Sequence, residues 1–93
     1  MERLTKQLEL WGHAVPPEQV APIPGGYAGE AIERLARFEN FYCDLLQAQA
    51  AYTAELDALK REGKTRSVRF RELMGKKLQN ADILIRLKYY GLE

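Results

Sequence analysis

The 93-residue chain lacks the residues from which disulfide frameworks and most metal sites are built. It contains one cysteine, Cys43, and one histidine, His13. A single cysteine excludes a disulfide within the chain, and this pair cannot supply the usual ligands of a structural zinc site. We therefore expect no metal and no other cofactor. A lone thiol is also typical of a protein of the reducing cytoplasm.

Long apolar runs are absent as well. No stretch approaches 18 consecutive apolar residues, and residues 1–6 lack the basic region and apolar core of a secretory signal. We expect a cytoplasmic protein without a membrane partner. The composition, 46% hydrophobic and 29% charged, is that of one folded domain, and we assign residues 1–93 to a single helical domain.

Motifs that carry chemistry are few. Gly63-Lys64-Thr65 is similar to the end of a phosphate-binding loop, but Ala58 stands where that motif needs a glycine. No histidine lies three residues after a glutamate, as di-metal helical bundles require. We predict that the protein is not an enzyme and has no catalytic, cofactor-binding or metal-binding residue. A site assembled across an oligomer interface is the alternative that stays open.

Prolines and glycines gather near the N-terminus. All four prolines and four of the seven glycines lie in residues 12–29. This composition predicts an extended connector over residues 12–28 with a turn at residues 24–26. Before the connector, apolar residues at 4 and 3 spacing (Leu4, Leu8 and Trp11) predict a short helix over residues 2–11.

The remainder of the chain has the periodicity of two long helices. The first, expected over residues 29–62, carries apolar positions spaced alternately by four and three, a heptad pattern that only Gln49 interrupts. Gly63 is expected to end it, and Thr65 or Ser67 to cap a second helix over residues 65–90. Gly91 is the expected end of that second helix.

A short connection predicts that these helices form a long antiparallel hairpin, so the expected fold is all-α. Gln49 then falls opposite Lys77, and Asp57 comes level with Arg69. Two interpretations of the polar pair in the seam stay open: it fixes the register, or the lysine extends its ammonium to water. The residues predicted to form the core or oligomer seam are Leu35, Phe38, Tyr42, Leu45, Gln49, Tyr52, Leu56, Phe70, Met74 and Lys77.

The apolar stripe is wider than two helices can cover. We therefore expect a homo-oligomer, with a dimer favoured, in which two hairpins form a four-helix bundle. A compact three-helix monomer is the alternative. The leading functional hypothesis is a self-associating interaction or assembly module, and an unidentified protein partner is also compatible with the stripe.

The net charge of +1 conceals two opposite halves. Residues 1–59 carry four basic and nine acidic groups, whereas residues 60–93 carry ten basic and four acidic groups. The basic half faces either an external polyanion or the acidic half of the same chain or of a copy. A nucleic-acid interface limited to phosphate contacts is the second functional hypothesis, and it is not the favoured one. Its candidate residues are Lys60, Arg61, Lys64, Arg66 and Arg69.

Overall fold

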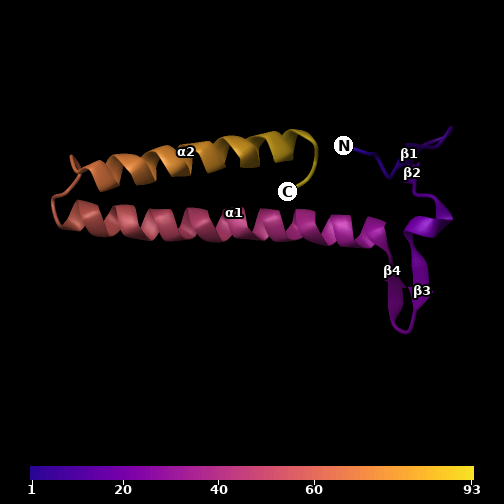
Figure 1. Cartoon of the computed structure of the whole chain (residues 1–93). Helices are drawn as coiled ribbons and strands as arrows, with labels where there is room; N and C mark the ends of the chain where they lie inside the picture. Colours follow the sequence, from indigo (N-terminus) through magenta and orange to yellow (C-terminus); the bar gives the residue numbers. More distant parts are fainter. The chain divides into compact units, whose positions relative to one another are not determined.

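The computed structural model describes all residues from 1 to 93 and combines two helices with two small antiparallel sheets (Figure 1). By contact density the chain divides into two units, Met1–Phe41 and Tyr42–Glu93, and α1 contributes to both. The elements in chain order are β1 (Lys6–Gln7), β2 (His13–Ala14), the 3-10 helix η1 (Pro17–Gln19), β3 (Ala21–Ile23), β4 (Gly26–Ala28), α1 (Glu30–Arg61) and α2 (Val68–Tyr89).

The N-terminal segment forms a β-hairpin, so the predicted helix over residues 2–11 is wrong. β1 pairs antiparallel with β2, with Gln7 opposite His13. The Leu8 N–H donates to the Gly12 carbonyl oxygen at 3.0 Å, and Gly12 has a φ of +84°. Three helical turns are marginally stable without a partner to pack on, whereas a glycine in the left-handed region closes a loop at little cost.

The connector contains a second hairpin. β3 and β4 pair antiparallel with Ala21 opposite Ala28, which gives the segment more structure than the expected extended chain. Pro24 precedes Gly25, whose φ is +86°, and this is the sequence pattern of a type II turn. The predicted turn is therefore confirmed. Gly29 lies so close to the Gln19 backbone that a Cβ would clash with it, which fixes the hairpin beside η1.

Both helix ends predicted at glycines are confirmed. At the end of α1 the Gly63 N–H donates to the Lys60 carbonyl oxygen at 3.1 Å, and the Lys64 N–H donates to Leu59 at 2.8 Å. This pair of bonds, with Gly63 at a φ of +72°, is a Schellman motif. Gly91 ends α2 in the same way. Of the two predicted N-caps, Ser67 is the one used: its Oγ accepts the Phe70 N–H at 3.1 Å.

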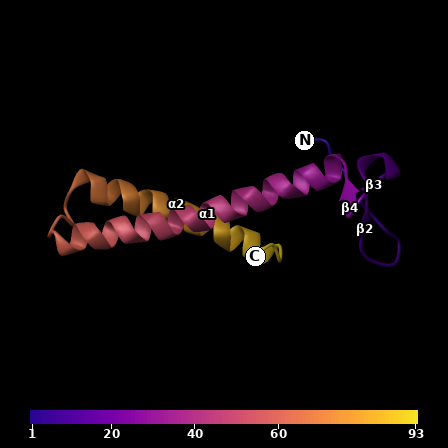
Figure 2. The same cartoon turned by 90° about the horizontal axis from the view of Figure 1, so that it is seen from below.

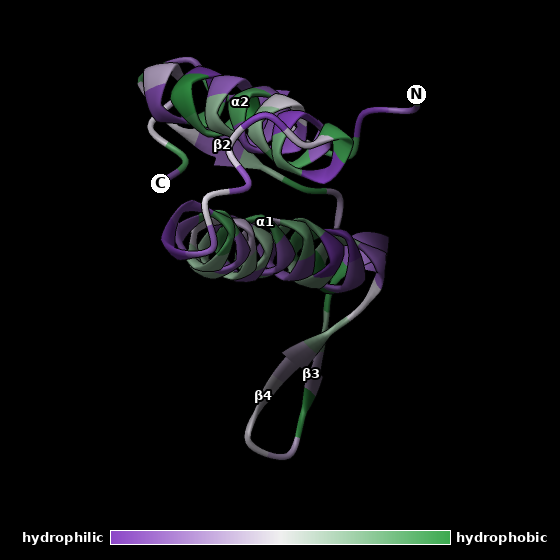
Figure 3. Ribbon diagram, turned by 90° about the vertical axis from the view of Figure 1, so that its left-hand side faces the viewer, coloured by the Kyte–Doolittle hydropathy of each residue, from purple (hydrophilic) through white to green (hydrophobic).

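The unit Tyr42–Glu93 consists of the C-terminal part of α1 and of α2, which runs back along it (Figures 1 and 2). Three leucines form its core: Leu45, Leu56 and Leu73 are 7%, 3% and 0% exposed. Hydrophobic and hydrophilic segments alternate along both helices (Figure 3), as expected when one face of each is covered.

The fold is therefore not all-α, and neither the hairpin with a short N-terminal helix nor the four-helix bundle describes it. Two β-hairpins precede the helices instead. The helix signal was reliable where the apolar periodicity extends over several heptads. It failed in the first eleven residues, where three apolar positions fit a helix but no neighbouring surface stabilises one.

Candidate functional site

The face of α2 that packs on α1 agrees with the predicted seam at Phe70 and Lys77, which are half-buried, but not at Met74. Its buried and half-buried positions follow a 3 and 4 spacing that includes Leu73 and the polar Asn80. Met74, which belongs to the predicted seam, lies at the edge of this face and is 38% exposed. Leu73 was absent from the predicted seam although it is fully buried. Apolar periodicity did not indicate this face clearly, because it contains the polar Asn80 and the neighbouring line of residues on α2 is more hydrophobic.

Gln49 and Lys77 lie opposite each other, as predicted, but the contact involves the backbone of the lysine. The Gln49 Nε2 donates to the Lys77 carbonyl oxygen at 3.0 Å. The Gln49 Oε1 is buried and has no hydrogen-bond partner. A buried acceptor without a partner reduces the folding stability by about 1–3 kcal/mol, which is more than the one hydrogen bond to Lys77 contributes.

We therefore expect Gln49→Leu to raise the free energy of unfolding by about 1 kcal/mol. Urea denaturation followed by circular dichroism measures this change. Gln47→Leu is the matched control, because Gln47 is exposed on the same helix and should give no such gain. A clear loss of stability in Gln49→Leu would instead indicate that its hydrogen bond to Lys77 outweighs the unsatisfied oxygen.

One side of the helix pair is charged. The Arg69 Nε donates to the Glu55 Oε2 at 2.6 Å, and its Nη2 donates to Oε1 at 3.0 Å. The hydrogen bonds and charge of Arg69 lower the pKa of Glu55, and Glu55 in turn raises the pKa of Arg69. The predicted partner of Arg69 was Asp57, so that pairing is wrong by two residues. An exposed pair of this kind fixes register more than it adds stability.

The opposite side of the pair is apolar. Tyr42 and Leu46 of α1 line a common cavity with Ile85 of α2. The turn of about 100° per residue places Met74 and Leu78 on the same line of α2 as Ile85. Leu46 is 46% exposed, and on α2 Leu78 and Ile85 are 65% and 51% exposed. We call this surface the apolar face and define it by five residues, Tyr42, Leu46, Met74, Leu78 and Ile85.

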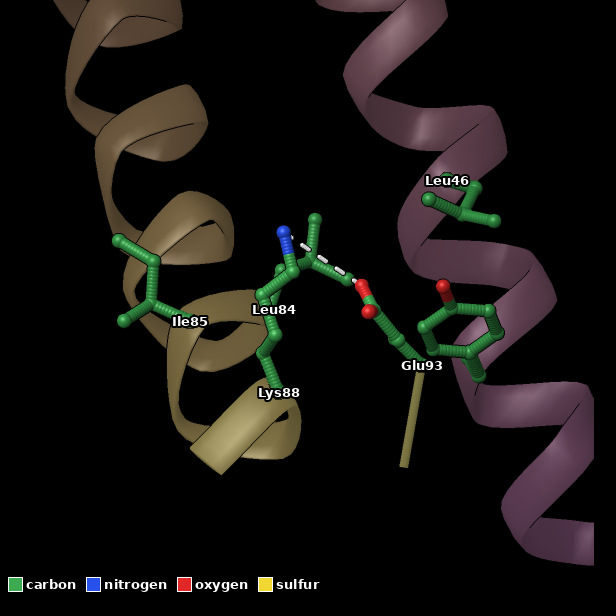
Figure 4. Close-up of a pocket in the computed structure, with 6 residues that line it drawn as sticks. Leu46, Leu84, Ile85, Lys88 and Glu93 are labelled. Atoms are coloured by element: carbon green, nitrogen blue, oxygen red, sulfur yellow. Dashed lines mark ion pairs between the residues drawn. The ribbon is translucent and has the colours of Figure 1, made fainter. Parts of the chain in front are cut away.

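A shallow cavity of about 170 Å³ opens on the apolar face between the two helices (Figure 4). Tyr42 and Leu46 line it from α1, and Leu84 and Ile85 line it from α2. At its rim the Lys88 Nζ lies 3.5 Å from the Glu93 Oε2, an ion pair made within the C-terminal segment. The cavity can accept an apolar side chain, and its two charged groups neutralise each other.

The connection between the helices is basic, and its backbone N–H groups take part in the cap of α1. We call Lys60, Arg61, Lys64 and Arg66 the basic turn. Arg69 belongs to the charged side instead, because Glu55 binds it. The backbone N–H groups of Gly63 and Lys64 are used in the cap of α1, so they cannot surround a phosphate as a phosphate-binding loop would.

The predicted seam residues occupy several environments. Leu45 and Leu56 are buried, while Tyr42, Tyr52, Phe70 and others are half-buried. In the unit Met1–Phe41, Leu35 is 53% exposed and Phe38 is half-buried. The first hairpin carries two strongly exposed apolar side chains, Leu10 and Trp11. The predicted helix over residues 2–11 gave no indication of this exposure.

No group of three or more histidine, cysteine, aspartate or glutamate side chains is arranged to hold a metal ion. Neither helix has the length and hydrophobicity needed to cross a membrane. Comparisons of the chain with protein-family models, with curated proteins and with solved structures find no match.

Proposed function

We propose that the chain is a non-enzymatic interaction and assembly module that self-associates through the apolar face. The observation that carries this proposal is the exposure of four large apolar side chains on one side of the helix pair. Contiguous exposed apolar surface of this kind is typical of protein contact sites. The four residues are Leu46, Met74, Leu78 and Ile85, exposed by 46%, 38%, 65% and 51%.

A second copy is the partner that we propose, because a symmetric contact covers the apolar face with an identical apolar surface. A stable interface of this kind removes about 800 Å² from each partner.

Charge on the apolar face is also compatible with a symmetric contact. The two charged groups of its cavity, Lys88 and Glu93, pair with each other. Two identical faces of this kind do not repel each other, as two faces with an excess of one charge would. We assign the module to the cytoplasm, since Cys43 is exposed and unpaired and a free thiol persists in a reducing compartment.

Sedimentation equilibrium of the full chain between about 1 and 100 µM tests the proposal. We expect a mass that rises with concentration to twice the 10.7 kDa of one chain. A strict monomer over this range would reject self-association. A different protein would then be the expected partner of the apolar face.

A further inference from the structure

We propose that the basic turn is a binding site for the phosphate backbone of nucleic acids. This site is separate from the apolar face, and it needs no second copy of the chain. Its ligand class is a single- or double-stranded polynucleotide, bound without reading the base sequence. Four cations and one acid, Glu62, lie within residues 60–67.

Most cations of the basic turn are free to bind an external anion. Glu62 forms its ion pair with Lys64, with the Lys64 Nζ 3.2 Å from the Glu62 Oε2. Lys60, Arg61 and Arg66 form no ion pair, and all three are exposed. A phosphate chain would therefore gain three cations without displacing a carboxylate of the protein.

Hydrogen bonds define the backbone that carries these cations. The Schellman motif at Gly63 sets the path that leaves α1, and the Ser67 Oγ both caps α2 and donates to the Lys64 carbonyl oxygen at 2.8 Å. The turn is thus tied at both ends by hydrogen bonds. A backbone that is already ordered loses less conformational entropy on binding than a flexible basic tail would.

The turn lacks the apolar side chains that strengthen the binding of a basic segment to a membrane surface. Residues 60–67 contain no apolar or aromatic side chain, so nothing in the turn can insert into a lipid layer. The same absence leaves no platform for base stacking. Lysine and arginine then bind phosphates only, which gives affinity without sequence preference.

Fluorescence anisotropy with labelled 20-nucleotide duplex DNA and single-stranded RNA tests this proposal. For about three phosphate contacts on duplex DNA, we expect binding to weaken about 40-fold between 50 and 200 mM salt. The double variant Lys60→Gln/Arg66→Gln should lower the slope of log affinity against log salt by about two. Its control, Arg3→Gln/Lys6→Gln, removes the same charge from the other unit and should retain the slope.

Three results would overturn the proposal. The first is no binding of either nucleic acid at 50 mM salt. The second is an equal loss of binding in the two double variants, which would show that net charge acts and the turn does not. The third is tighter binding to vesicles containing anionic lipid than to nucleic acid. Because the turn lies outside the apolar face, each of these results would leave the proposal of self-association standing.

Discussion

Leu73→Ala should remove about 3–5 kcal/mol from the free energy of unfolding of the helical unit. Leu73 is 0% exposed and is one of only three buried side chains in the chain. Truncation loses the transfer energy of the side chain and leaves a cavity that two helices held by so small a core cannot fill. Domains are stable by only about 5–15 kcal/mol, so we expect much of the helical circular dichroism signal to be lost at lower temperature.

Thermal and urea denaturation of three variants measures this effect. Val68→Ala is the control, because Val68 is 64% exposed at the start of α2 and should change stability by less than about 0.5 kcal/mol. Leu73→Met keeps most of the volume and should cost less than about 1.5 kcal/mol. If Leu73→Ala were no more destabilising than Val68→Ala, the packing of α2 on α1 described above would be incorrect.

Leu78→Glu should prevent the self-association proposed above and leave the chain a monomer. Leu78 is 65% exposed on the apolar face, so a polar residue there leaves the fold of the single chain intact. In a symmetric contact the substitution places a carboxylate in the apolar interface twice. An unpaired buried charge costs about 3 kcal/mol or more, which corresponds to a dissociation constant raised more than about 100-fold.

Gln79→Glu is the matched control for this variant. It introduces the same charge at the next residue of α2, where the helical turn directs the exposed side chain away from the apolar face. Light scattering after gel filtration should therefore give a monomer for Leu78→Glu and a dimer for Gln79→Glu. A dimer for both variants would exclude Leu78 from the contact, and a monomer for both would show that the effect is not specific to Leu78.

The sequence predicted the helical part of the fold because its signals are local and redundant. Gly63 and Gly91 end helices through backbone conformations that glycine adopts most easily, and Ser67 supplies a cap that few residue types can replace. The first eleven residues offered weaker signals. Their apolar spacing fits a helix, but the hairpin depends on pairing between Lys6–Gln7 and His13–Ala14, for which periodicity gives no indication.

The candidate surfaces were partly predictable for a related reason. Lys60, Arg61, Lys64 and Arg66 are close in sequence, so any tight turn gathers them. The apolar face required knowledge of which side of α2 meets α1. Hydrophobicity placed Met74 in the seam with Phe70 and Lys77, whereas the structure buries Leu73 and leaves Met74 38% exposed. Two adjacent apolar stripes on one helix compete for the same partner, and only packing in three dimensions decides between them.

The most direct test of self-association through the apolar face is an isotope-filtered nuclear Overhauser experiment on a mixture of ¹³C-labelled and unlabelled chains. This experiment detects only contacts between different copies. We predict contacts that involve the methyl groups of Leu46, Leu78 and Ile85, all of which are exposed in the single chain. Contacts between copies at the Glu55 and Arg69 side, or none at a concentration of several hundred micromolar, would contradict the proposal.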